Sequence, residues 1–302
     1  MKKSLIALAV MAAAGVASAQ SSVTMYGVAD LSFADTSAPG VSMSMSGNGG
    51  MNNGSSRLGV RGVEDLGGGL KVSFQFEQGI NAETGATDAA TFQRAAPMGI
   101  SGGFGTVNLG RRLTPSYFGV AAWELTGTAN YSVVASRFGF GGGGPSRNNS
   151  EFSYTTPNMG GFSATLGMIT KGDNAGNSKT DANVIYKGGP LTVGFSYNKV
   201  KNASANNSIG AKYNFGAFEV AGSIQNPGGA ARGFTLGAGA NLGPVSLVLD
   251  IARETKVAKT TDYLLEVKYP LSKRTFAYGA YLRNGAAGAK VSNYGFGVRH
   301  NF

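Results

Sequence analysis

Apolar and polar residues alternate on both sides of a tight turn in segment 56–78. In its first half, apolar residues alternate with Arg57 and Arg61; in its second half, an apolar series from Leu70 to Phe76 alternates with polar residues. Glycines supply the turn, because Gly adopts the positive φ values that reverse a chain. Since successive side chains of a strand point to opposite faces, the pattern predicts a hairpin with one apolar and one charged face.

Two arrangements fit such a hairpin. A sheet beside water turns its charged face outward, whereas the wall of a membrane barrel turns its apolar face to lipid and its polar face to a channel. The same alternation recurs along the chain and predicts sixteen strands, with seven short turns and eight longer polar loops alternating between them. This asymmetry is typical of bacterial outer-membrane barrels.

Aromatic residues near predicted strand ends, such as Tyr186, Tyr213 and Tyr269, match the girdles of such barrels. A β-sandwich would rarely contain sixteen uniform strands. We therefore predict an all-β fold, a sixteen-stranded antiparallel transmembrane β-barrel with both termini on the short-turn, periplasmic side.

Two segments depart from the alternation. The fourth predicted strand, from Arg94 to Ile100, contains Pro97, which usually marks an edge or a bulge. The segment from Arg111 to Arg147 is the longest without strand alternation, yet it is rich in large apolar residues. A segment of that composition is not disordered, and we expect it to pack somewhere other than in water.

The N-terminus predicts export. Two lysines, an apolar run over residues 5–16 and Ala17-Ser18-Ala19 form the pattern of a cleavable signal peptide, and the run is too short to span a bilayer. We expect residues 1–19 to be removed and residues 20–302 to form the barrel domain.

Composition narrows the class further. The chain has no cysteine, 48 glycines and 9 prolines, and its mean hydropathy of −0.04 is not that of a helical membrane protein. The formal net charge of +10 could indicate nucleic-acid binding. Export and the scattering of the basic residues over alternating strands argue against that partner.

No constellation predicts catalysis. The sole histidine is His300, beside the C-terminus, at a position that the alternation places on the lipid-facing side of the last strand. Without cysteine a His/Cys metal site cannot form, and the glycine-rich stretches lack the GK[ST] of a phosphate loop. We predict no enzyme, no metal and no cofactor.

The chain resembles the trimeric general porins of Gram-negative outer membranes, in particular their β-proteobacterial branch. The segments that carry the resemblance are 22–30, 56–78, 104–111, 148–150 and 299–302. The resemblance implies a homotrimer and a third extracellular loop, here 111–147, folded into the lumen as a constriction. It also implies a C-terminal Phe302 that the barrel-assembly machinery recognises, and outer-membrane lipid around the barrel.

If the chain is such a porin, the charged side chains that face the lumen determine which ions the channel prefers. On the resemblance, Arg57, Arg94 and Arg147 form a cluster at the constriction, and positively charged rings favour anions. The full set of predicted constriction residues is Arg57, Arg61, Arg94, Arg111, Glu124 and Arg147. Glu124, the one acid of the loop, is expected to face the arginines. Other charges predicted to face the lumen are Asp30, Glu77, Lys71, Lys187, Lys212, Lys268, Arg283 and Arg299.

We predict a passive diffusion channel for small hydrophilic solutes and ions, with a preference for anions. A barrel acting mainly in adhesion or envelope anchoring would need long extracellular loops, and most loops here are short. A solute-specific channel would need a ladder of aromatic or arginine side chains, for which Tyr26 and Tyr281 are too few. For the trimer contact we predict the first five strands, with Gly27, Gly62 and Ala95 giving small outward residues.

Overall fold

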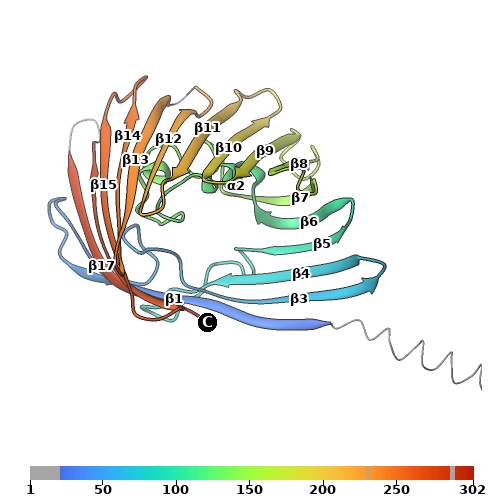
Figure 1. The fold of residues 1–302 in the computed structure, drawn as a ribbon, viewed down its shortest axis with the longest axis horizontal. Coiled ribbons are helices and arrows are strands. Elements are labelled where there is room, and N and C mark those ends of the chain that lie inside the picture. Colours follow the sequence, from blue (N-terminus) through green and yellow to red (C-terminus); the bar gives the residue numbers. More distant parts are fainter. Residues whose placement is uncertain (1–20, 230, 286–289) are drawn as a thin grey trace, which may run out of the picture.

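Hydrogen bonds between antiparallel strands close the chain into a ring (Figure 1). The computed structural model describes residues 21–229, 231–285 and 290–302. Strand β1 (Ser22–Thr36) pairs through its first half with β3 (Arg57–Gly67) and through its second half with β17 (Val291–Asn301). This double pairing closes the barrel. The predicted sixteen-stranded antiparallel barrel is confirmed, and the predicted signal peptide lies outside the described residues.

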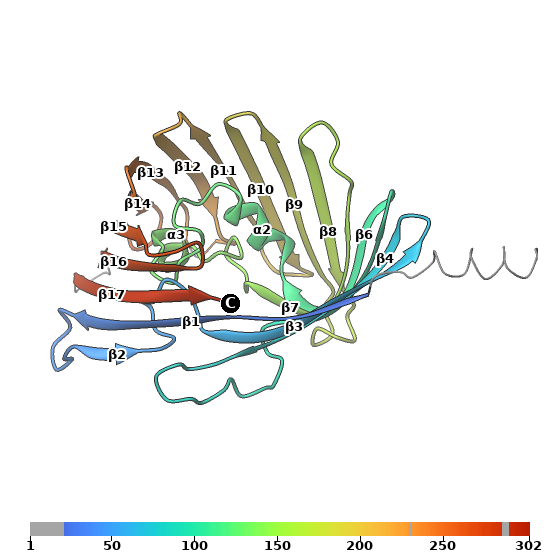
Figure 2. The same cartoon turned by 60° about the horizontal axis from the view of Figure 1, so that its bottom comes forward.

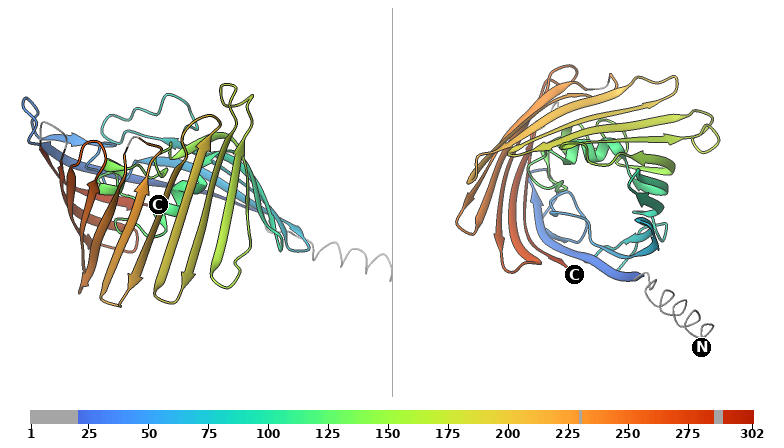
Figure 3. Two further views of the ribbon diagram at one scale, coloured as in Figure 1. Left: turned by 90° about the horizontal axis from the view of Figure 1, so that it is seen from above. Right: turned by 45° about the vertical axis from the view of Figure 1, so that its right-hand side comes forward.

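The remaining strands follow in chain order around the ring (Figure 3). They are β4 (Leu70–Gly79), β5 (Ala96–Gly102), β6 (Gly105–Leu113), β7 (Arg147–Thr155), β8 (Phe162–Ile169), β9 (Lys179–Gly188), β10 (Leu191–Val200), β11 (Asn206–Asn214), β12 (Phe218–Asn226), β13 (Gly233–Leu242), β14 (Val245–Glu254), β15 (Thr261–Pro270) and β16 (Thr275–Asn284). A short strand, β2 (Ser44–Ser46), lies in the first long loop and pairs with β1.

The two faces of the wall differ as the alternation predicts. Large apolar side chains such as Leu236 and Leu249 are 58% and 60% exposed on the outside. Acidic residues of neighbouring strands, including Asp250 and Glu266, point inward and are buried. Within the described ranges no helix is long and apolar enough to cross a bilayer.

Two predicted boundaries were wrong. The fourth barrel strand begins at Ala96 and not at Arg94, because Ala95 makes only an isolated bridge with Glu77 before regular pairing starts. The long irregular segment is shorter at both ends than predicted: β6 continues to Leu113 and β7 begins at Arg147, so Arg111 and Arg147 belong to strands.

The loop between β6 and β7, residues 114–146, folds into the barrel and contains two short helices, α2 (Pro115–Ala121) and α3 (Val133–Arg137) (Figure 2). Thr114 caps α2 by accepting a hydrogen bond from the Tyr117 amide, and Pro115 fits the first turn because its missing N–H has no helical acceptor there.

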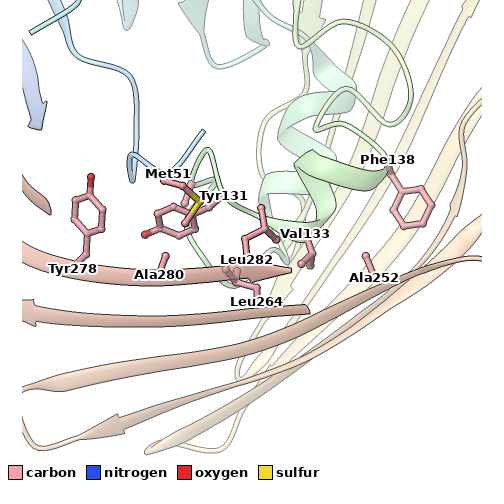
Figure 4. Packing of buried hydrophobic residues seen from close by; sticks show 10 residues of the cluster. Met51, Tyr131, Val133, Phe138, Ala252, Leu264, Tyr278, Ala280 and Leu282 are labelled. Carbon is pink, nitrogen blue, oxygen red and sulfur yellow. The ribbon is translucent and has the colours of Figure 1, made fainter. Parts of the chain in front are cut away.

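The apolar side chains of this loop pack against the inner wall. Helix α2 lies on β9 and β10, and α3 lies on β14 and β15. Tyr131, Val133 and Phe138 form a buried cluster with wall residues such as Leu264 and Leu282 (Figure 4). The expectation that the segment packs away from water is met inside the barrel.

Glycines of the inner wall make room for the loop. A Cβ built on Gly210 would lie 2.3 Å from Cε2 of Trp123, which is 1% exposed. A Cβ on Gly194 would lie 2.0 Å from the carbonyl oxygen of Gly119 in α2. Side chains at these positions would push the loop toward the channel axis.

We predict that Gly210→Ala lowers the free energy of unfolding by about 1–3 kcal/mol, because the added methyl overpacks the Trp123 contact. Urea titration of the detergent-solubilised barrel measures the change. The matched control is Gly279→Ala, where an added Cβ would lie 3.9 Å from its nearest neighbour, the carbonyl oxygen of Gly295. Equal losses from both changes would contradict the packing argument.

Candidate functional site: an arginine-lined constriction

Six arginines gather on one side of the channel. They line a pocket of about 590 Å³ and are Arg57, Arg61, Arg94, Arg112, Arg147 and Arg299. We call them the arginine wall. Five of them come from the adjacent row β3 to β7 or the residues just before β5, and four of these, all but Arg61, lie at the strand ends nearest the long loops. Neighbouring strands lie about 4.8 Å apart, so the row brings side chains distant in sequence together.

Glu77 on β4 is the acid within this wall. Its carboxylate accepts a hydrogen bond from Arg94 Nε at 2.8 Å and lies 3.6 Å from Arg57 Nε. Tyr26 also donates to it, at 2.8 Å. Arg147 Nε donates to the carbonyl of Arg94 at 2.8 Å. Among the described residues that line the pocket, six guanidinium groups therefore face one carboxylate.

The opposite side of the pocket carries no charge. Loop 114–146 contributes Tyr117, Phe118 and Thr128 to it, and the Tyr117 hydroxyl donates to Thr128 at 2.9 Å or accepts from it. Cations on one side and uncharged groups on the other leave a strongly positive potential in the gap. The arrangement can hold or pass anions.

Buried polar contacts fix the loop in this position. Asp181 on β9 accepts from the amide of Ser116 at 2.7 Å at the start of α2. Tyr131 donates to Glu266 on β15 at 2.7 Å, and burial beside that carboxylate raises the pKa of Tyr131, which keeps the phenol protonated. Arg137 of α3 pairs with Asp262.

The first long loop also reaches inward and braces the third. Met51 packs in the same apolar cluster as Tyr131, and Asn53 donates to the Tyr131 hydroxyl at 2.8 Å. Asp30 holds this loop by accepting from Asn52 and from the Gly54 amide, each at 2.9 Å. The predicted lumen charge Asp30 is thus fully buried and serves as an anchor.

The structure places two other predicted residues differently. A bulge between Gly110 and Arg112 turns Arg112, and not Arg111, toward the pocket. Arg111 therefore lies outside the arginine wall, where it binds Asn149 and the Gln93 carbonyl. Glu124 does not face the arginines. Its carboxylate accepts from Thr126, Ser132 and the Thr128 amide inside the loop.

Of the remaining predicted lumen charges, Lys71 and Lys212 lie away from the constriction and Arg299 belongs to it. Lys71 is exposed near the turn that joins β3 and β4. Lys212 pairs with Glu219 at 3.6 Å. Arg299 joins the arginine wall and donates to Asn53 at 2.8 Å.

One predicted lumen charge faces the other way. Arg283 on β16 lies opposite Tyr263 on the outer face of β15, and residues directly opposite each other in an antiparallel pair share a face of the sheet. The prediction that Arg283 faces the lumen was therefore wrong.

Sequence reasoning missed Arg112 and Tyr117 as members of the site. Arg112 was next to the chosen residue, and only the bulge decides which of two adjacent arginines points inward. Thr114 and Pro115 form a cap-and-proline pattern that could have indicated a helix start before Tyr117, but no sequence signal shows which side of that helix faces the channel. Among the described residues, no group of three or more His, Cys, Asp or Glu side chains could hold a metal ion.

Comparison with known proteins agrees with the barrel and its inward loop. The sequence profile of the Gram-negative porin family matches residues 5–302. This chain is a Gram-negative porin. The outer membrane porin protein 32 of Delftia acidovorans is 36% identical over 94% of this chain and 90% of its own length. A Bordetella pertussis outer membrane porin is 29% identical over the full length of both chains.

Solved structures of other proteins have the same barrel fold as this chain. An anion-selective porin from Comamonas acidovorans superposes with a TM-score of 0.76 at 28% identity, covering 94% of this chain and 100% of its own. Solved structures at 15% identity share the fold, among them OmpT, an outer membrane protein of Vibrio cholerae, with a TM-score of 0.69. The porin described here is thus a passive channel of the outer membrane.

We predict that Glu77→Gln raises the preference for anions, because it removes the carboxylate that neutralises part of the arginine wall. Glu124→Gln is expected to leave selectivity nearly unchanged, since that carboxylate is 3% exposed within the loop. Reversal potentials across a planar bilayer in a salt gradient measure both. A larger shift from Glu124→Gln would overturn this assignment.

Proposed function

We propose that this porin is an anion-preferring channel for small hydrophilic solutes and ions. The observation that carries the proposal is the arginine wall, in which six guanidinium groups meet one carboxylate at the pocket beside the inward loop. Guanidinium stays charged at any working pH. The name of the Comamonas acidovorans relative, an anion-selective porin, supports the same preference.

The electric field of the arginine wall acts across the whole space between that wall and loop 114–146. Charges in a narrow space with low-dielectric walls focus their potential, and the Debye length at physiological salt is about 8 Å, which leaves screening in a narrow gap incomplete. An anion therefore meets an attractive potential at the constriction, and a cation meets a barrier.

Replacing both Arg57 and Arg94 by Ser is expected to move the reversal potential toward cations without unfolding the barrel, since lumen substitutions tune selectivity. The control is Lys187→Ser on β9, a charge predicted to face the lumen but outside the pocket lining. An equal shift from Lys187→Ser would mean that total lumen charge sets selectivity, and the constriction proposal would be lost.

For assembly, we propose a homotrimer with its contact on β1 and β3–β6. The resemblance to trimeric porins supports it, as do Val23, Met25 and Met98, which are 69%, 67% and 55% exposed on the outside. The small residues chosen from the sequence do not supply the contact. A Cβ on Gly27 would lie 2.3 Å from the Phe302 ring, a Cβ on Gly62 would lie 2.3 Å from the Phe74 ring, and Ala95 is buried.

We expect Met98→Glu to shift the protein toward monomer in mild detergent, because a carboxylate in a subunit contact loses hydration without gaining a partner. Cross-linking followed by denaturing electrophoresis measures the trimer fraction. Leu249→Glu, on the far side of the barrel, is the control. A wild-type protein that cross-links only as monomer would contradict the trimer, while the channel proposal would stand.

Processing and insertion complete the proposal. Removal of residues 1–19 would free Gln20 as the N-terminus, as the signal-peptide pattern indicates. Phe302 directly follows β17, and its amide and carbonyl bond to Gly27 on β1. We assign it as the C-terminal residue that the barrel-assembly machinery recognises, with membrane lipid surrounding the finished barrel.

A further inference from the structure

Three Asn-Gly dipeptides occur in the chain, at 48–49, 53–54 and 284–285. This dipeptide is prone to deamidation, because glycine has no Cβ to keep its backbone nitrogen away from the preceding side chain. In the reaction, the glycine nitrogen loses its proton and attacks Cγ of the asparagine. Ammonia leaves with a proton, and a cyclic imide forms. Water then opens the ring to aspartate or isoaspartate, so a neutral amide becomes a carboxylate.

The middle dipeptide lies in the first long loop, at the constriction. Asn53 and Gly54 both line the pocket of the arginine wall, and Asn53 is 4% exposed. Its side-chain nitrogen donates to the Tyr131 hydroxyl and its side-chain oxygen accepts from Arg299, both at 2.8 Å. Both ends of the side-chain amide are thus held, which opposes the rotation that would bring Cγ onto the Gly54 nitrogen.

The attacking nitrogen is held as well. The Gly54 amide donates to Oδ2 of Asp30 at 2.9 Å, and Asp30 is fully buried. A hydrogen bond to a carboxylate is a strong one, and it is lost when the nitrogen gives up its proton. The negative charge of the carboxylate also repels the negative charge that the nitrogen then carries, at short range and away from water. Asp30 therefore disfavours the first step of the reaction.

The third dipeptide has the same arrangement, and the first does not. The Gly285 amide donates to Oδ1 of the buried Asp262 at 2.8 Å. The Gly49 amide instead donates to two neutral side-chain oxygens, at 2.9 and 2.8 Å, and Asn48 is exposed. The chain therefore contains two dipeptides held by carboxylates and one internal comparison.

We propose that Asn53 is a latent deamidation site in the constriction and that the Asp30 carboxylate keeps it unreacted. Conversion adds a second acid to the pocket, where Glu77 is otherwise the one carboxylate among the described lining residues, and places it at bonding distance from Arg299. It also removes the donor to Tyr131 that braces the first long loop against the third. The modified channel has a weaker preference for anions, a consequence that rests on the proposed function.

Peptide mapping by mass spectrometry measures the conversion at each dipeptide. The detergent-solubilised porin and the same chain unfolded in guanidinium chloride are incubated in parallel at mildly alkaline pH. In the unfolded chain, the three asparagines are expected to convert at similar rates. In the folded barrel, Asn53 and Asn284 are expected to convert roughly tenfold or more slowly than Asn48, since each attack loses a hydrogen bond to a carboxylate. Conversion of Asn53 as fast in the barrel as in the unfolded chain would overturn the proposal.

The variant Asp30→Asn tests the role of the carboxylate. It keeps the shape of the side chain and removes its charge, and it is expected to raise the conversion of Asn53 while leaving that of Asn284 unchanged. The matched variant Asp262→Asn is expected to do the reverse. Heat-modifiable migration on a gel checks that each variant is folded. An unchanged or lower rate at Asn53 in the Asp30→Asn barrel would mean that the carboxylate is no barrier or that it acts as the base, and either result contradicts the proposal.

The variant Asn53→Asp reproduces the product with Asp30 in place. Its reversal potential in a salt gradient is expected to shift toward cations, and Asn284→Asp, outside the pocket lining, is the control with a smaller shift. Equal shifts from the two variants would overturn the effect on selectivity. A reversal potential that responds neither to Asn53→Asp nor to the arginine substitutions would overturn the proposed function, whereas the conversion rates would still decide whether Asp30 protects Asn53.

Discussion

The structure depends on the requirement that backbone groups inside a membrane find hydrogen-bond partners within the protein. A sheet meets this requirement only when it has no free edge in the hydrocarbon. Strand β1 supplies the closure by pairing with β3 through one half and with β17 through the other. Closure then fixes which residues face lipid and which face the lumen, because the side-chain period of a strand is two.

The inward loop is the second determinant of function, and it is held by packing as much as by charge. Its apolar residues occupy space that glycines such as Gly210 leave free on the wall, while Asp181 and Glu266 bind it through buried hydrogen bonds. The loop therefore lies against one side of the barrel. The open passage is displaced toward β3–β7, where the arginine wall lies.

The fold could be predicted from the sequence because alternation, turn glycines and loop lengths all report on the same periodic structure. The site was only partly predictable. Alternation alone placed Glu77 correctly on the inner face, but a bulge exchanged Arg111 for Arg112. Glu124 was expected to face the channel, and local hydroxyl and amide donors enclosed it instead. Such outcomes depend on tertiary contacts that a single strand pattern does not contain.

Within the pocket, charge lies on one side only, and this has a consequence for the path of a solute. We expect a permeating anion to follow a strip along the guanidinium groups, with uncharged parts of the same molecule left toward Tyr117 and Phe118. An elongated solute with one charged end is thereby turned across the axis as it passes. Its crossing involves a loss of rotational freedom that a compact inorganic ion does not experience. The channel can thus discriminate by molecular shape even among solutes of equal charge and cross-section.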